Sequence, residues 1–112
     1  MITIAEEQNG EVTVLDINGR VDGSAAKPFE DRLITLLQSG RNRIMVDCKR
    51  LVFISSAGCR ALLVAMRLAQ KNNSRLALCN ITAEVLRVLE LGGLSDYFVI
   101  YPSREEGIAK LA

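Results

Sequence analysis

The sequence has 112 residues, of which 49% are hydrophobic, and its 14 basic and 13 acidic side chains give a formal net charge of +1. Because one domain takes roughly 150 residues, this length favours a single domain over residues 1–112. A near-neutral chain with two tyrosines, three phenylalanines and no tryptophan has neither the positive charge nor the stacking surface typical of nucleic-acid binding. We therefore expect no direct contact with nucleic acid.

Histidine is absent from the sequence, which excludes Ser-His-Asp triads, Cys-His dyads and histidine-containing metal sites. The three cysteines, Cys48, Cys59 and Cys79, lie far apart without CxxC spacing. We expect them to be reduced core residues and the protein to be cytoplasmic. We also expect no metal site, no cofactor and no enzymatic activity.

Neither a signal peptide nor a membrane span is expected. The acidic residues Glu6 and Glu7 follow the start almost at once, and no basic segment precedes an apolar one there. The longest stretch without a charged residue, Leu51–Cys59, is far shorter than the ~20 residues that a membrane-spanning helix needs. We therefore expect no membrane insertion.

The first half of the chain predicts a hairpin, a helix and a strand. Alternating apolar residues predict an edge strand over Ile2–Glu7, Asn9-Gly10 is typical of a tight hairpin, and Val12–Ile17 reads as a buried strand. After a loop over Gly19–Lys27, with Pro28 in the first turn, helical spacing joins four apolar residues: Phe29, Leu33, Leu36 and Leu37. Ser39-Gly40 should end this helix, and the apolar run Ile44–Cys48 predicts a central strand.

The second half alternates helices with strands. A loop through Asp47–Ser55 should lead into a long helix over Ser56–Asn72, in which Leu62, Leu63, Met66 and Ala69 face the core. The remaining expected elements are a strand over Leu76–Cys79, a helix capped by Thr82 and ended by Gly92-Gly93, a strand over Tyr97–Tyr101, and a short helix from the capping box at Ser103 to Leu111.

The resulting order is β-β-α-β-α-β-α-β-α. Strands that alternate with helices imply parallel neighbours joined by right-handed crossovers. The predicted fold is therefore a single α/β domain with a mixed, mostly parallel sheet of about five strands and about four α-helices.

Two loops at the carboxyl ends of predicted strands carry the candidate site, because sites in open α/β sheets gather there. The first contains Asp22 and Ser24, and turn formation with helix capping is an equally weighted interpretation for its glycines and Ser24. The second, Phe53–Gly58, places two hydroxyl groups at the start of the long helix. Either Ser55 or Ser56 could be the N-cap, or one could accept a phosphate, which the helix N-terminus stabilises.

Several segments together resemble the STAS domains, and most closely the free-standing bacterial anti-sigma factor antagonists. The resemblance covers almost the whole chain and is carried by Gly19–Asp22, Val46-Asp47, Phe53–Gly58 with Leu62-Leu63, and Glu84–Leu94 with Phe98. It implies a partner-switching protein that binds an anti-sigma factor, itself a serine kinase, and so frees a sigma factor. Phosphorylation by that kinase would break the complex, and a PP2C-type phosphatase would restore the binding form.

Motif position makes Ser56 the implied phosphoacceptor and Ser55 the second candidate. Ser55 stands where the family usually has an acidic residue, Ala57 where it has a hydroxyl, and Arg60 where it often has a glycine. The expected partner-binding surface consists of Asp22, Ser24, Phe53, Ile54, Ser55, Ser56, Ala57 and Gly58. A phosphate there would oppose binding through like-charge repulsion and desolvation.

Other interpretations keep the same fold. The domain could be a structural or sensory interaction module of a transporter or another signalling assembly, and a homodimer through apolar helix faces stays open. Nucleotide binding is disfavoured because no GxxxxGK[ST] motif occurs and Gly92-Gly93 follows a helix. Cys59 lies in the first turn of the long helix, where a thiol can become reactive, but without a histidine it is interpreted as a core residue.

Overall fold

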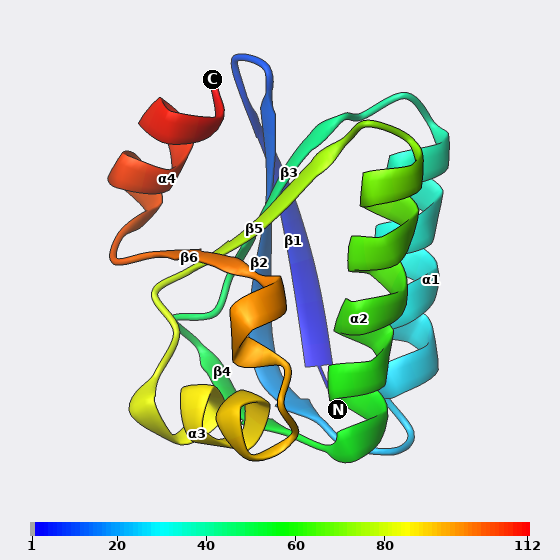
Figure 1. Cartoon of the computed structure of the whole chain (residues 1–112), viewed down its shortest axis with the longest axis vertical. Coiled ribbons are helices and arrows are strands. Elements are labelled where there is room, and N and C mark those ends of the chain that lie inside the picture. Colours follow the sequence, from blue (N-terminus) through cyan, green and yellow to red (C-terminus); the bar gives the residue numbers. More distant parts are fainter. Residues whose placement is uncertain (1) are drawn as a thin grey trace.

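The computed structural model describes residues 2–112 and shows one sheet with helices on both of its faces (Figure 1). The elements, in chain order, are β1 (Ile2–Asn9), β2 (Val12–Val21), α1 (Ala26–Gln38), β3 (Arg43–Asp47), β4 (Leu51–Ile54), α2 (Ser56–Lys71), β5 (Arg75–Cys79), α3 (Ala83–Leu91), the 3-10 turn η1 (Ser95–Tyr97), β6 (Val99–Tyr101) and α4 (Arg104–Leu111). Over these residues, no helix is both long and apolar enough to span a bilayer.

The sheet is mixed and mostly parallel, as the sequence predicts. Its strand order is β1-β2-β3-β5-β6, and β4 pairs with the C-terminal end of β2. Among the strands of residues 2–112, only β1 and β2 pair in antiparallel orientation. Gly10 adopts a φ of 60° in its turn, a conformation that glycine reaches without strain, so the hairpin predicted at Asn9-Gly10 is confirmed.

The sequence predicts about five strands and a loop over Asp47–Ser55, and the structure places a sixth strand within that loop. Within that segment, Leu51–Ile54 forms β4, whose ends are buried, and it pairs with β2 in parallel. β4 finds a pairing partner because β2 continues past Ile17 to Val21. At Gly19 the backbone φ is 120°, and the register of the pair shifts between Gly19 and Arg20. The predicted loop at Gly19–Lys27 therefore begins only after Val21.

The helices begin and end close to their predicted limits because their signals are local. The hydroxyl oxygens of Thr82 and Ser103 accept hydrogen bonds from the backbone N–H groups of Val85 and Glu106, which caps α3 and α4. The expected strand over Tyr97–Tyr101 is shorter: η1 includes Tyr97, and β6 begins at Val99.

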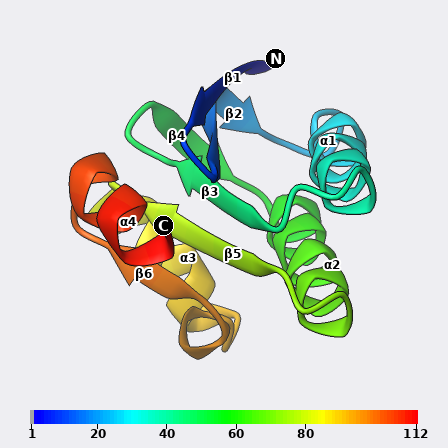
Figure 2. The same cartoon turned by 90° about the horizontal axis from the view of Figure 1, so that it is seen from above.

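Two hydrophobic cores lie on opposite faces of the sheet. The larger one is buried under α1, α2 and α3, and the smaller one under α4 (Figure 2). A Cβ on Gly107 would come within 2.2 Å of Met45 Sδ, so glycine lets α4 approach the sheet closely. All three cysteines are free and buried, which agrees with their interpretation as core residues.

Asp47, at the end of β3, anchors the start of α4. Its side chain is 5% exposed. Oδ1 accepts hydrogen bonds from the Lys49 backbone N–H (3.0 Å) and Asn80 Nδ2 (3.1 Å), and Oδ2 accepts one from Arg104 Nε at 2.9 Å. Burial raises the pKa of this carboxyl group, but the three hydrogen bonds and the Arg104 charge outweigh burial and leave the pKa below its ordinary value.

Replacing Asp47 by asparagine should therefore lower the free energy of unfolding by about 1.5–3 kcal/mol at neutral pH. The native pKa is lower than the unfolded one, so the stability from the carboxylate is present above roughly pH 4 and is lost as the pH falls through the native pKa. Urea unfolding of wild type and Asp47→Asn across this range measures the effect. Asp96→Asn, at an exposed position, is the control. A wild-type advantage that is as large in strong acid as at neutral pH contradicts the assignment.

Candidate functional site

The ends of β2 and β4 bring the two candidate loops together. Val21 pairs with Ile54, and the Ser55 backbone N–H donates to the Val21 carbonyl oxygen at 2.8 Å. The turn that follows Val21 therefore lies beside the first turn of α2. This is the meeting of loops that the sequence predicts from the carboxyl ends of parallel strands.

The two adjacent serines have different environments. Ser55 is the N-cap of α2, and its Oγ accepts a hydrogen bond from the Gly58 backbone N–H at 3.1 Å. Ser56 is the first helical residue and is exposed, and within residues 2–112 its hydroxyl makes no hydrogen bond. The choice of N-cap that the sequence leaves open is thereby decided: Ser55 is the cap, and Ser56 presents a free hydroxyl.

Ile54 and Gly58 support the loop from inside. Ile54 is 1% exposed and Gly58 is buried. A Cβ on Gly58 would lie 2.7 Å from Ile54 Cγ1 and 2.8 Å from Val21 Cγ1, so only glycine lets α2 begin this close to the two strands. The expectation that both residues contact a partner is therefore corrected, because the folded domain covers them.

Asp22 and Ser24 form the turn that leads into α1. Asp22 Oδ1 accepts hydrogen bonds from the Ser24 backbone N–H (3.0 Å), Ser24 Oγ (2.8 Å) and the Ala25 backbone N–H (3.0 Å). These bonds, the one from the Ser24 hydroxyl first, lower the pKa of Asp22 below its ordinary value. The turn interpretation is thus confirmed, and it also fixes a carboxylate charge in the loop adjoining Ser55.

Phe53 and Ala57 are the remaining members of the predicted partner-binding surface. Ala57 is exposed and Phe53 is partly exposed. The guanidinium carbon of Arg20 lies 4.4 Å from the centre of the Phe53 ring, within the range of a cation–π contact. The accessible residues of the predicted surface therefore supply a free hydroxyl, a small side chain and an aromatic ring over which the Arg20 guanidinium lies.

An apolar groove of about 420 Å³ opens between α2 and α3, beginning at Ser56. Its lining residues are Ser56, Cys59, Arg60, Leu63, Val88, Leu91, Gly92 and Leu94. Leu63, expected in the core, is only half-buried here, and Leu91 is 76% exposed. Sequence reasoning missed this groove. The sequence indicated it only through Leu91. This residue is two positions after the buried Leu89, so it does not share the buried face of α3.

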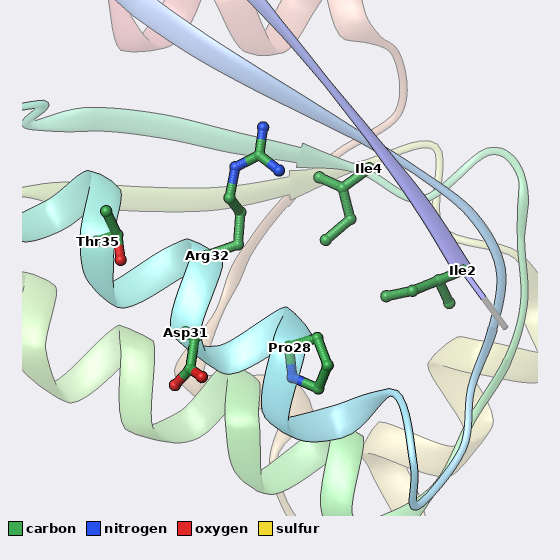
Figure 3. Close-up of a pocket in the computed structure, with 6 residues that line it drawn as sticks. All are labelled: Ile2, Ile4, Pro28, Asp31, Arg32 and Thr35. Carbon is green, nitrogen blue, oxygen red and sulfur yellow. The ribbon is translucent and has the colours of Figure 1, made fainter.

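A second hollow, of about 450 Å³, lies between β1 and α1 (Figure 3). Ile2, Ile4 and Pro28 provide its apolar wall, and Asp31, Arg32 and Thr35 its polar one. The two charged groups are already paired, Asp31 with Lys27 at 2.9 Å and Arg32 with Glu6 at 3.2 Å. None of these residues belongs to the site that the sequence predicts.

The chemistry available at the Ser56 site is that of one exposed hydroxyl group. Within residues 2–112, no three histidine, cysteine or acidic side chains are grouped to hold a metal ion. Burial raises the pKa of the Cys59 thiol, which disfavours its reactive thiolate form. A group attached to Ser56 would lie at the positive end of the α2 dipole, where an anion is stabilised.

Comparison with known proteins shows the family. The sequence model of the STAS domain matches residues 3–107. The chain belongs to the STAS domain family. It is 31% identical over 93 residues to BtrV of Bordetella bronchiseptica, described as an anti-sigma factor antagonist, and the match covers 83% of this chain and 80% of that protein.

Solved structures show the same fold at lower identity. An anti-sigma factor antagonist from Mycobacterium paratuberculosis aligns with a TM-score of 0.88 and 20% identity, covering 99% of this chain and 94% of that one. The anti-sigma factor antagonist SpoIIAA in its unphosphorylated form aligns with a TM-score of 0.82 and 24% identity over 96% of this chain and 95% of that one. SpoIIAA has also been solved in a phosphorylated form, which aligns with a TM-score of 0.77 and 23% identity over 98% of this chain and 100% of that one.

The contrast between the two serines is testable by stability alone. Ser55→Ala should lower the free energy of unfolding by about 1 kcal/mol, because it removes the N-cap of α2. Ser56→Ala should change it by less than about 0.5 kcal/mol, because the Ser56 hydroxyl is exposed and unbonded. Urea unfolding of both variants measures the difference, and an equal loss in both variants contradicts the assignment of Ser55 as the cap.

Proposed function

We propose that this STAS domain is a cytoplasmic anti-sigma factor antagonist controlled by phosphorylation at Ser56. The unphosphorylated form binds a serine-kinase anti-sigma factor and releases the sigma factor. Phosphorylation of Ser56 blocks binding, and a PP2C-type phosphatase restores the binding form. The observation that carries the proposal is the exposed, unbonded hydroxyl of Ser56 at the start of α2.

The environment of the two serines supports Ser56 over Ser55 as the acceptor. A kinase must bring the acceptor hydroxyl into line with the transferred phosphoryl group. Ser56 is exposed and free, whereas modifying Ser55 would remove the hydroxyl that accepts the Gly58 N–H and would disturb the first turn of α2. Ser56 can therefore be modified without loss of the fold.

A phosphate on Ser56 changes the charge of the proposed contact surface. It adds about −1.5 to −2 charges at neutral pH to a surface otherwise formed by Ala57, Phe53 and the mouth of the α2–α3 groove. The Asp22 carboxylate is already fixed in the adjoining loop. A partner that fits the neutral hydroxyl would have to desolvate the new charge, which opposes association.

The expected size of this effect is sufficient for a switch. An unpaired charge introduced into a protein interface costs roughly 2–5 kcal/mol, by analogy with the loss of one partner of a buried charge pair. At about 1.4 kcal/mol per factor of ten, this corresponds to a roughly 30-fold to 4,000-fold weaker complex. Two partners at similar cellular concentrations would then exchange.

The experiment is a capture from the native host's lysate with wild type, Ser56→Ala and Ser56→Asp as immobilised baits. Wild type and Ser56→Ala should retain a protein with an ATP-binding serine-kinase domain, and Ser56→Asp should retain roughly 30-fold less of it. Mass spectrometry of the retained proteins identifies the partner.

The control bait is Ser74→Asp, which adds the same charge beyond the C-terminal end of α2, at the opposite end of the helix from Ser56. It should retain the kinase as wild type does. The proposal fails if Ser56→Asp binds the kinase as tightly as wild type. It also fails if all baits retain the same partner without a kinase domain, as expected for a scaffold module of a transporter or another assembly.

A further inference from the structure

Arg60 lies one helical turn beyond Ser56 on the same side of α2. Both side chains line the mouth of the α2–α3 groove. Residues four apart on a helix have Cβ atoms about 5–6 Å apart, well within the reach of an arginine side chain. Ser56 precedes Arg60, so a negative group on Ser56 would give the favourable i, i+4 order of acid before base.

The charge of Arg60 has no partner in the structure. Within residues 2–112, its guanidinium makes neither an ion pair nor a side-chain hydrogen bond, and its side chain is exposed. No acidic side chain lines the groove, whose remaining walls are mostly apolar. Arg60 is thus a cation held beside an apolar surface, with Ser56 close to it.

We propose that Arg60 is the intramolecular counter-ion of the phosphate on Ser56. This inference rests on the proposed function and extends it to a second residue of the same helix face. The planar guanidinium can bind two phosphate oxygens at once.

The pair makes Arg60 a second element of the switch. In the unmodified protein, the free guanidinium is available to an acidic group on the partner that docks at the groove. After phosphorylation, the phosphate occupies the guanidinium and holds it at the mouth of the groove. The partner then meets a new negative charge and also loses the cation to which it could bind.

The test installs phosphoserine at position 56 during translation, so that no kinase is required. Phosphorus NMR then follows the second ionisation of the phosphate in the wild-type, Arg60→Gln and Arg60→Lys backgrounds. Arg60→Gln should raise the phosphate pKa by about 0.5, and Arg60→Lys should restore part of the difference. The same ion pair should make phosphorylation raise the melting temperature more in wild type than in Arg60→Gln.

The matched control is Arg67→Gln. Arg67 is exposed on the same helix, and eleven residues place it on nearly the same face as Ser56 but about 16 Å away. It should leave the phosphate pKa unchanged. The inference is overturned if Arg60→Gln leaves that pKa unchanged, or if Arg67→Gln shifts it equally, because the effect would then be one of net charge.

The two proposals fail in distinguishable ways. If the host kinase never modifies Ser56, the proposed function fails while the NMR comparison still reports whether Arg60 holds the phosphate. If the kinase is captured and the switch operates but Arg60→Gln has no effect on the phosphate, the proposed function stands and the inference about Arg60 is wrong.

Discussion

The structure depends on the parallel pairing of Val21 with Ile54, at the point where α2 begins. Gly58 lies against both side chains, so close that a Cβ on this residue would clash with them. This contact sets the first turn of α2 beside the Asp22 turn and so joins two loops that are more than 30 residues apart in the chain. Without it, Ser56, the groove and the Asp22 carboxylate would not share one surface.

Most polar groups near this contact are committed to the fold. Asp22 and Ser24 form the turn into α1, and Ser55 caps α2. Against these, the free hydroxyl of Ser56 and the unpaired guanidinium of Arg60 are the exceptions. Groups that the fold does not use, placed beside an apolar groove, are what a regulated interface requires, because they can change state without unfolding the domain.

The parts of the fold that the sequence predicts well are those specified by local sequence patterns. The spacing from Phe29 to Leu37 and the caps at Thr82 and Ser103 act within one or two helical turns, so they can be recognised without tertiary structure. The short strand β4 could not be found in this way, because its pairing with Arg20 and Val21 depends on a distant segment. Burial explains the correction at Ile54 as well: an apolar residue next to a predicted site can equally well support the site from the core.

The central claim is that Ser56, and not its neighbour, carries the switch. The most direct measurement is tandem mass spectrometry of the protein isolated from its native host with phosphatases inhibited. We expect a singly phosphorylated form whose fragment ions place the phosphate on Ser56, with Ser55 unmodified. A phosphate on Ser55, or a protein unphosphorylated at both serines in every growth condition sampled, would contradict it.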